Sequence, residues 1–320
     1  MMMMSIARRG SCRHVATVAA KRAPVFNRIA PFSAAERSAF ETDGFVVRED
    51  LLTLAACDHL RARFDPLFRG EFPTGVYPDE WHWREGISKP DSFREMVNAW
   101  KCCPHVAEVA RSPHLGALAS ELLGWAPHGG ARLAQDDLLW KPPGAKGVGF
   151  HADAHYISDQ FERSVGEGKH SSVSLTVWIA LDDVDEENGS LEYAVGSHVW
   201  AREASRQPST FFAKGDDVRA PARRMAAAAG VELDLRTVTM RAGCAVFHHE
   251  HVLHGSGPNR SHTRPRRALG VHLMRRDVTF RLEPAPDYIY GRYVIRGERQ
   301  PREDFFPVTW SPRHHPGCAR

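Results

Sequence analysis

The chain has 320 residues, of which 42% are hydrophobic, and this suffices for the core of one domain that carries a few additional helices. Its formal charge of +3 comes from the first 31 residues, which hold six basic side chains and no acid; residues 32–320 therefore carry about −3, which does not favour nucleic acid as a partner. No stretch approaches the roughly 18 consecutive apolar residues of a membrane span, and the six cysteines lack the spacing of a zinc site or a disulfide framework.

Residues 1–31 differ in composition from the rest of the chain. They are rich in arginine and alanine, contain some serine and have no long apolar run, which fits a mitochondrial transit peptide better than a secretory signal. A disordered extension is an equally good interpretation. We therefore expect a soluble intracellular protein, cytoplasmic or mitochondrial, with a single domain over residues 32–320.

Three helices are expected in the N-terminal third, over residues 33–42, 53–68 and 112–123. The first starts with the capping-box pattern, in which Ser33 is followed three residues later by Glu36, and Gly44 ends it. The third has Ser112 as its N-cap and Gly124 just past its end.

From about Arg132 onward the sequence consists of short runs rich in β-branched and aromatic residues, separated by Gly, Pro, Asn and Asp. This texture predicts several short strands packed as a sandwich or barrel. The expected strands are LAQDDLLWK, GVGFHADAHYI, SVSLTVWIAL, GSLEYAV, TVTMRAGCAVFHH and RRALGVHLM. Two long interruptions, residues 159–172 and 201–230, are interpreted as loops of the kind that often form active-site lids.

The segment GFHADAHY carries the first candidate metal ligands. On a strand, His151 and Asp153 would point to the same face and present an imidazole beside a carboxylate. With a second histidine from elsewhere, they would form the two-histidine, one-carboxylate triad that leaves three positions on the metal open. By itself the pattern is weak, because three residues of this kind often occur by chance in a chain with 18 histidines, and a hydrogen-bonded strand histidine is the simpler interpretation.

A second segment, FHHEHVLHGSGPNRSHTRPRRALGVHL, adds a histidine followed by Gly-Ser-Gly and then a basic strand. Together with HADAHY and WIALDDVDEENGSLEYAVGSH, in chain order, it resembles the phytanoyl-CoA dioxygenase family over residues 40–280. The resemblance implies an all-β core with flanking N-terminal helices (α+β): a double-stranded β-helix, or jelly-roll, of the cupin type. It also implies Fe(II), 2-oxoglutarate as cosubstrate and O2, with His151, Asp153 and His254 as the iron ligands.

Three other histidines compete with His254 for the distal ligand position. His248, His249 and His251 all precede it in the same segment. Only His254 is followed by Gly-Ser-Gly, which allows the chain to turn tightly beside a metal.

The same resemblance implies an arginine that binds the distal carboxylate of 2-oxoglutarate, a task for which a bidentate, permanently charged side chain is suited. The family has this arginine eleven positions after the distal histidine, where this chain has Pro265, so we assign the role to Arg266, with Arg264 and Arg267 as alternatives. Strand alternation places Arg267 on the face opposite Arg266.

Two further residues match family positions that contact the cosubstrate. Ser256 can hydrogen-bond its carboxylate, and Trp178 can line its pocket, although an aromatic residue in LTVWIAL is also a typical core residue. Residues that could line a substrate pocket are Tyr77, Trp81, Trp83, His155 and Tyr156.

The expected activity is the hydroxylation of an unactivated C–H bond in a small organic molecule, with release of succinate and CO2. Asp153 argues against halogenation, because halogenating relatives have a small residue at this position. The resemblance does not separate hydroxylation from desaturation, epoxidation or ring closure, and it leaves the oligomeric state undetermined. The alternatives are a metal enzyme of this fold that does not use 2-oxoglutarate and a catalytically silent binding protein.

Overall fold

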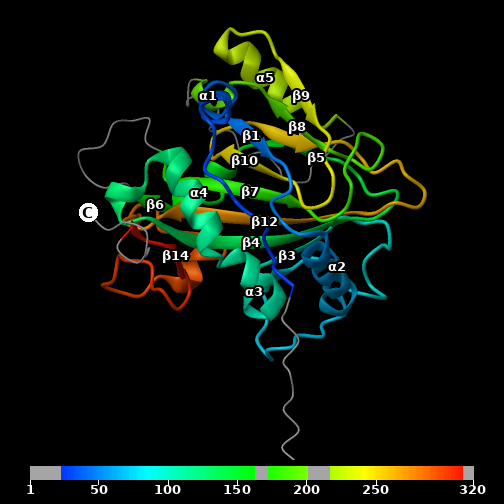
Figure 1. The fold of residues 1–320 in the computed structure, drawn as a ribbon, viewed down its shortest axis with the longest axis horizontal. Helices are drawn as coiled ribbons and strands as arrows, with labels where there is room; N and C mark the ends of the chain where they lie inside the picture. The colour runs from blue at the N-terminus through cyan, green and yellow to red at the C-terminus, as the bar shows by residue number, and fades with distance from the viewer. Residues whose placement is uncertain (1–22, 163–171, 201–216, 313–320) are drawn as a thin grey trace, which may run out of the picture.

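The computed structural model describes residues 23–162, 172–200 and 217–312, which fold around two antiparallel β-sheets (Figure 1). The larger sheet has eight described strands, in the order β1-β10-β7-β12-β4-β3-β2 with β14 paired to β4. The smaller sheet has the order β5-β11-β8-β9, and β13 pairs separately with β6. The strands are β1 (Phe45–Arg48), β2 (Glu80–Trp81), β3 (Arg94–Val97), β4 (Ala131–Lys141), β5 (Val148–His151), β6 (Phe161–Glu162), β7 (Ser174–Ala180), β8 (Leu191–Ala194), β9 (Leu235–Val238), β10 (Ala245–His249), β11 (His254–Ser256), β12 (Arg266–Arg275), β13 (Thr279–Phe280) and β14 (Val308–Trp310).

Helices cover the outer face of the larger sheet. The α-helices of the described residues are α1 (Ala34–Asp43), α2 (Leu54–Phe68), α3 (Pro104–Ala110), α4 (Pro113–Leu123) and α5 (Ala220–Ala229). Residues of α1 to α4 share one hydrophobic cluster with the larger sheet, whereas α5 packs beside β5 of the smaller sheet. The larger sheet therefore lies between a helical layer and the smaller sheet (Figure 1).

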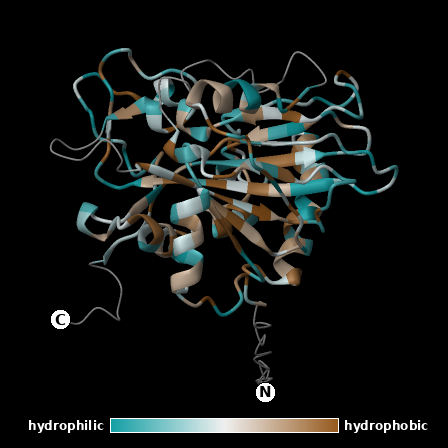
Figure 2. Ribbon diagram, turned by 90° about the horizontal axis from the view of Figure 1, so that it is seen from above, coloured by the Kyte–Doolittle hydropathy of each residue, from teal (hydrophilic) through white to brown (hydrophobic). Residues whose placement is uncertain are grey.

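Strand alternation explains how one sheet serves both layers. Leu175, Val177 and Ile179 of β7 are buried in the cluster that contains the helices. Thr176 and Trp178 point to the opposite face and line a cavity between the sheets. Because successive side chains of a strand face opposite ways, the larger sheet has an apolar outer face and a partly polar inner face. Figure 2 shows hydrophobic residues running through the central strands and hydrophilic residues in the surrounding loops.

The three predicted helices are present with the expected ends. The Ser33 hydroxyl accepts a hydrogen bond from the Glu36 backbone N–H, while the Glu36 carboxylate accepts one from the Ser33 N–H. Gly44 ends this helix at a φ of 85°, a conformation that favours glycine. Ser112 caps α4, as predicted, and Thr53 caps α2.

Three segments differ from the sequence expectation. The strand expected over residues 147–157 ends at His151, because the Ala154 N–H bonds to the Glu250 carbonyl and Asp153–His155 forms a 3-10 turn. The segment TVTMRAGCAVFHH forms two strands, β9 and β10, in different sheets. The interruption over residues 201–230 contains helix α5. Most of the two candidate lids, residues 163–171 and 201–216, lies outside the described residues.

The end of the proposed N-terminal extension contacts the domain. Phe26 forms an isolated bridge with Leu52, and the Thr53 N–H donates to the Val25 carbonyl at 3.0 Å. Residues 1–22 lie outside the described part of the chain. Within that part, no helix combines the length and the apolar character needed to cross a membrane.

Candidate active site

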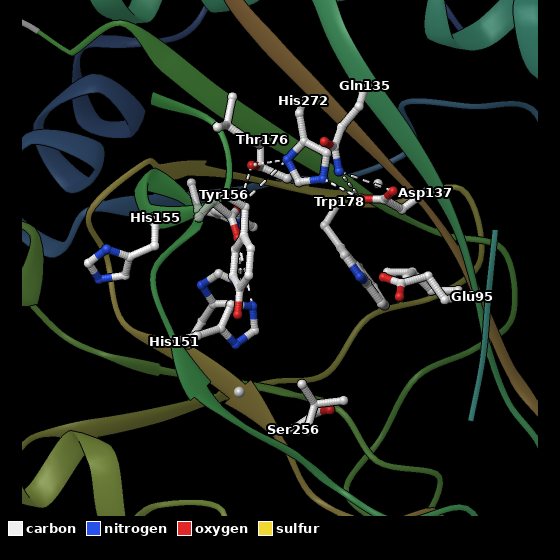
Figure 3. A pocket seen from close by; sticks show the side chains of 18 of the residues that line it. Glu95, Gln135, Asp137, His151, His155, Tyr156, Thr176, Trp178, Ser256 and His272 are labelled. Carbon is white, nitrogen blue, oxygen red and sulfur yellow. Dashed lines mark hydrogen bonds and ion pairs between the residues drawn. The ribbon is translucent and has the colours of Figure 1, made fainter. Parts of the chain in front are cut away.

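A cavity of about 510 Å³ lies between the two sheets (Figure 3). Its walls come from β3, β4, β7, β10 and β12 of the larger sheet and from β5, β8 and β11 of the smaller one. All the site residues chosen from the sequence line it: His151, Asp153, Trp178, His254, Ser256 and Arg266. Of the suggested pocket residues, His155 and Tyr156 also line it; Tyr77, Trp81 and Trp83 do not.

His151, Asp153 and His254 converge at one end of this cavity. His151 is the last residue of β5 and lies opposite His254, the first residue of β11, while Asp153 begins the 3-10 turn that follows β5. Asp153 Oδ1 lies 3.7 Å from His151 Nε2 and 3.6 Å from His254 Nε2. Within the described residues, these three form the one group of ligand atoms that could surround a metal ion, all within 4.8 Å of one another.

The hydrogen bonds of the two histidines leave their Nε2 atoms as acceptors. Nδ1–H of His151 donates to the Gly149 carbonyl at 2.9 Å, and Nδ1–H of His254 donates to the Val252 carbonyl at 3.2 Å. Burial lowers the pKa of both imidazoles to about 4, so both are neutral at neutral pH. Two nitrogen lone pairs and a carboxylate oxygen thus face one another in a buried site. A bound cation would be attracted by all three groups and would compensate the buried negative charge, so the residues fit a metal ion.

The same pKa shifts predict how the metal-free protein responds to acid. Between pH 6.5 and about 4 the unfolded chain binds protons at His151 and His254 that the folded chain does not, so the free energy of unfolding falls as the pH falls through this interval. Urea unfolding of the metal-free protein across this range measures the effect. A variant carrying His151→Gln and His254→Gln should show a shallower decline, and an equal decline in both proteins would contradict the assignment.

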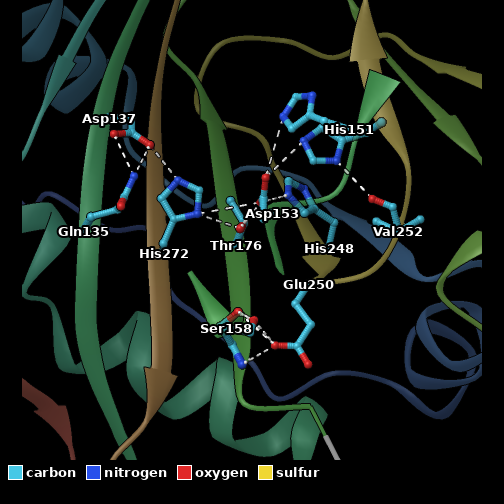
Figure 4. Close-up of polar contacts among 12 residues, drawn as sticks. Gln135, Asp137, His151, Asp153, Ser158, Thr176, His248, Glu250, Val252 and His272 are labelled. Atoms are coloured by element: carbon cyan, nitrogen blue, oxygen red, sulfur yellow. Dashed lines mark hydrogen bonds and ion pairs between the residues drawn. The ribbon is translucent and has the colours of Figure 1, made fainter. Parts of the chain in front are cut away.

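The second oxygen of Asp153 is held by hydrogen bonds from the larger sheet (Figure 4). His248 donates from Nε2 to Asp153 Oδ2 at 2.9 Å, and the Thr176 hydroxyl donates to the same oxygen. The other nitrogen of His248 accepts from the Tyr193 hydroxyl at 2.9 Å. Of the histidines that competed with His254, His248 therefore hydrogen-bonds the Asp153 carboxylate and is not itself a candidate ligand. His249 and His251 do not line the cavity.

A chain of hydrogen bonds continues from Thr176 to β12 and β4. His272 Nδ1 lies 2.8 Å from the Thr176 oxygen, and His272 Nε2 lies 2.7 Å from Asp137. Since the Thr176 proton is directed at Asp153, both ring nitrogens of His272 must donate, which makes His272 a cation. Burial alone would lower its pKa, but the hydrogen bond and charge of Asp137 raise it above its ordinary value.

Glu250 fixes the turn that carries Asp153. It is fully buried, and its carboxylate accepts hydrogen bonds from the backbone N–H of Ser174 at 3.0 Å and from the hydroxyls of Ser158 and Ser174 (Figure 4). Its backbone carbonyl accepts from the Ala154 N–H at 2.8 Å. One buried acid thus ties the turn after β5 to the start of β7.

Gly255 follows the distal histidine for a different reason from the one expected. It lies inside β11, where an added Cβ would come within 2.7 Å of the Phe150 ring and 2.9 Å of the Val148 carbonyl. Close approach of the neighbouring strand, not a tight turn, excludes a side chain at this position.

The three candidate arginines have different surroundings. Arg264 pairs with Asp185 and Glu187, and Arg267 pairs with Asp182. Arg266 is 2% exposed, lies with its guanidinium 5.2 Å from the centre of the Trp178 ring, and has no hydrogen bond or acidic partner among the described residues. A buried cation without a counterion, lining a cavity, fits a carboxylate ligand.

Lys141 is a second buried cation at this end, and the sequence did not single it out. Its ammonium donates to the Ser256 hydroxyl at 2.8 Å and to the Gly257 carbonyl. No acidic residue in the described part of the chain pairs with it, and burial together with the charge of Arg266 holds its pKa well below its usual range. Lys141, Ser256 and Arg266 therefore form a group of hydrogen-bond donors at this end of the site, and a bound carboxylate would favour the charged form of Lys141.

A jelly-roll core with two histidines and one carboxylate in the cavity between its sheets defines the class of mononuclear metal enzymes with a facial triad. The family model for phytanoyl-CoA dioxygenase (PhyH) matches residues 40–268. The chain belongs to this family and is a non-haem iron, 2-oxoglutarate-dependent dioxygenase.

Relatives in the family differ in substrate. Ectoine dioxygenase from Nocardia farcinica (strain IFM 10152) is 26% identical over 260 residues, which cover 76% of this chain and 80% of that protein. Peroxisomal phytanoyl-CoA dioxygenase from Bos taurus is 24% identical over 264 residues, 74% of this chain and 67% of that protein.

Solved structures confirm the predicted fold. The α-ketoglutarate-dependent carbocyclase SnoK from nogalamycin biosynthesis has a TM-score of 0.64 at 24% identity, covering 87% of this chain and 96% of that one. EctD from S. alaskensis, solved with 2-oxoglutarate and 5-hydroxyectoine, has a TM-score of 0.60 at 20% identity, covering 87% and 88%.

Proposed function

We propose that this enzyme hydroxylates an unactivated C–H bond of a small organic molecule, converting 2-oxoglutarate, O2 and R–H into succinate, CO2 and R–OH. Arg266 carries the proposal: a buried guanidinium without an acidic partner lines the same cavity as the converging triad. A metal enzyme that does not use 2-oxoglutarate would have no need for this cation, and a silent binding protein would have no need for the triad.

In this proposal His151, Asp153 and His254 hold Fe(II), which supplies the activation of O2 when it is bound. A metal held by these three side chains would keep further coordination positions available for the keto acid and O2. His248 and Thr176 fix the Asp153 carboxylate so that Oδ1 alone faces the two imidazoles. Arg266 binds the distal carboxylate of 2-oxoglutarate, Ser256 hydrogen-bonds it, and the Trp178 ring forms one wall of its pocket.

Succinate release tests the proposed reaction. The purified protein, supplied with Fe(II), 2-oxoglutarate and O2, is expected to form succinate slowly without substrate and faster with it, and the product should gain one oxygen atom by mass spectrometry. Succinate formation that does not depend on Fe(II), or oxidation that proceeds without 2-oxoglutarate, would contradict the proposal.

Thr176→Val is expected to weaken metal binding by about 10-fold to 100-fold, the range typical of partners that orient a metal ligand. The substitution removes one hydrogen bond to Asp153 Oδ2 and nearly preserves the volume of the side chain. Competition with a chromophoric chelator measures the metal dissociation constant. Thr237→Val, on β9 and outside the cavity, is the control and should bind as the unchanged protein does. Equal affinities in all three proteins would exclude this role for Thr176.

Lys141→Met is expected to raise the dissociation constant of 2-oxoglutarate by about 10-fold or more, because it removes an amine that a bound carboxylate would hold in its charged form and the donor that orients Ser256. Titration of 2-oxoglutarate into the Fe(II)-loaded protein under anaerobic conditions measures this constant. Lys146→Met, an exposed lysine in the loop after β4, is the matched control. An unchanged constant in Lys141→Met would show that Lys141 serves packing only.

A further inference from the structure

Glu95 is a buried carboxylate that the proposed reaction does not use. It lies on β3 opposite Leu139 of β4, is 9% exposed and lines the cavity (Figure 3). No hydrogen bond or ion pair of its carboxylate is found among the described residues, although buried acids are normally paired. Burial, followed by the negative charge of Asp137, raises the pKa of Glu95 to about 8.

The groups around Glu95 do not neutralise it. Asp137 carries the same charge and is occupied by His272 at 2.7 Å and by the Gln135 amide at 3.1 Å. His272 directs both of its N–H groups elsewhere, at Asp137 and Thr176. Glu80, a further acid close enough to raise the pKa of Glu95, pairs with Arg292. None of these neighbours donates a hydrogen bond to Glu95. With a pKa of about 8 it is mostly protonated at neutral pH in the empty site, and a bound cation would favour its charged form.

Two tyrosine rings line the same cavity as this acidic pair. Tyr288 lines the cavity, and after burial the charges of Asp137 and Glu95 are the largest contributions that raise the pKa of its hydroxyl. Its ring lies 6.4 Å from that of Tyr156, and its backbone has a φ of 50°, uncommon for a residue other than glycine. Carboxylates next to aromatic faces are the usual surroundings of a bound organic cation.

We infer that the substrate carries a positively charged nitrogen, an ammonium or amidinium group, which binds to Glu95 within the acidic, aromatic part of the cavity. The inference rests on the proposed function, because it names the substrate class for that same site. Two parts of the cavity then bind opposite charges. Arg266 and the nearby Lys141 attract the carboxylate of 2-oxoglutarate, and Glu95 with Asp137 attracts the cationic group of the substrate.

The charges that line the cavity also disfavour an anionic substrate such as a coenzyme A thioester. Arg266 is the one arginine or lysine among the described lining residues, and the proposed function assigns it to 2-oxoglutarate. The cationic His272 also lines the cavity, but its two N–H groups are directed at Asp137 and Thr176. The other lining acids outside the triad are Glu95, Asp137 and Asp287. Like charges of this kind repel phosphate groups and raise the local concentration of cations.

Three probes of one shape and different charge test the inference. They are cyclohexylmethylamine, which is protonated at neutral pH, cyclohexylmethanol and cyclohexanecarboxylate. Saturation-transfer NMR measures their dissociation constants for the full chain loaded with Zn(II) and 2-oxoglutarate, and again without both. The ammonium probe is expected to bind at least about 10-fold more tightly than the alcohol, and the alcohol more tightly than the carboxylate.

Glu95→Gln, which keeps the shape of the side chain, should remove the preference for the ammonium probe and leave the affinity for the alcohol unchanged. Glu298→Gln, an exposed acid outside the cavity, should keep the preference. Equal binding of ammonium and alcohol, no detectable binding of the ammonium probe, or a preference that survives in Glu95→Gln would overturn the inference. These outcomes are separate from a failure to bind Fe(II) and 2-oxoglutarate, which would instead overturn the proposed function.

Discussion

Replacing Arg266 with glutamine is expected to raise the dissociation constant of 2-oxoglutarate by about 30-fold or more. Truncating one partner of a buried, hydrogen-bonded charge pair costs about 2–5 kcal/mol, and 1.4 kcal/mol corresponds to a factor of ten. Arg266 is suited to such a pair, because its side chain is buried and has no acidic partner among the described residues. Arg266→Lys should recover part of the affinity by restoring the charge without the two-pronged geometry.

Arg267→Gln is the matched control for this experiment. Arg267 is the next residue on β12, but it faces away and pairs with Asp182. Its replacement should change the affinity for 2-oxoglutarate little, while metal binding should be retained in both variants. A similar loss of 2-oxoglutarate affinity in both variants would show that the substitutions disturb β12 as a whole and not a specific contact with the carboxylate.

Asp153→Ala is expected to reduce Fe(II)-dependent succinate formation by more than about 100-fold. Replacing a residue that only hydrogen-bonds a metal ligand already lowers metal affinity or activity by about 10-fold to 100-fold, and Asp153 is itself a proposed ligand. The substitution removes the only negatively charged ligand and leaves His248 and Thr176 without their acceptor. Metal affinity and succinate formation are measured in the same preparation. Asp159→Asn, in which a half-exposed acid near the same turn is changed, should retain both. Full activity in Asp153→Ala would exclude the proposed triad.

Helix ends and the adjacent pair of candidate ligands could be predicted because their signals are local. Ser33, Glu36 and Gly44 act within one helix, and their roles follow from a few residues of sequence. His151 and Asp153 are two positions apart and matched a family pattern. The short helix α3 lacks comparable end signals, since Cys103 at its N-cap makes no capping hydrogen bond and Arg111, not glycine, follows its last residue.

The contacts around the triad could not be predicted, because they depend on which strands lie side by side. Thr176 and His272 meet across β7 and β12, which are far apart in sequence. The pairing of Glu95 with Leu139 likewise requires knowledge that β3 adjoins β4. A weak signal was present: polar residues recur at alternate positions of otherwise apolar strands, as with Thr176 in SLTVWIA. Periodicity shows that such residues share a face, but it does not show what they contact.

The assignment of roles to His151, Asp153, His254, Arg266, Ser256 and Trp178 stays a prediction until cofactor binding is measured. The most direct measurement is the visible absorption spectrum of the anaerobic protein after Fe(II) and 2-oxoglutarate are added. A weak charge-transfer band that appears only with both additions, is lost in His151→Ala and needs higher 2-oxoglutarate in Arg266→Gln is the predicted result. Bound iron without such a band, or a band unchanged in both variants, would contradict the account.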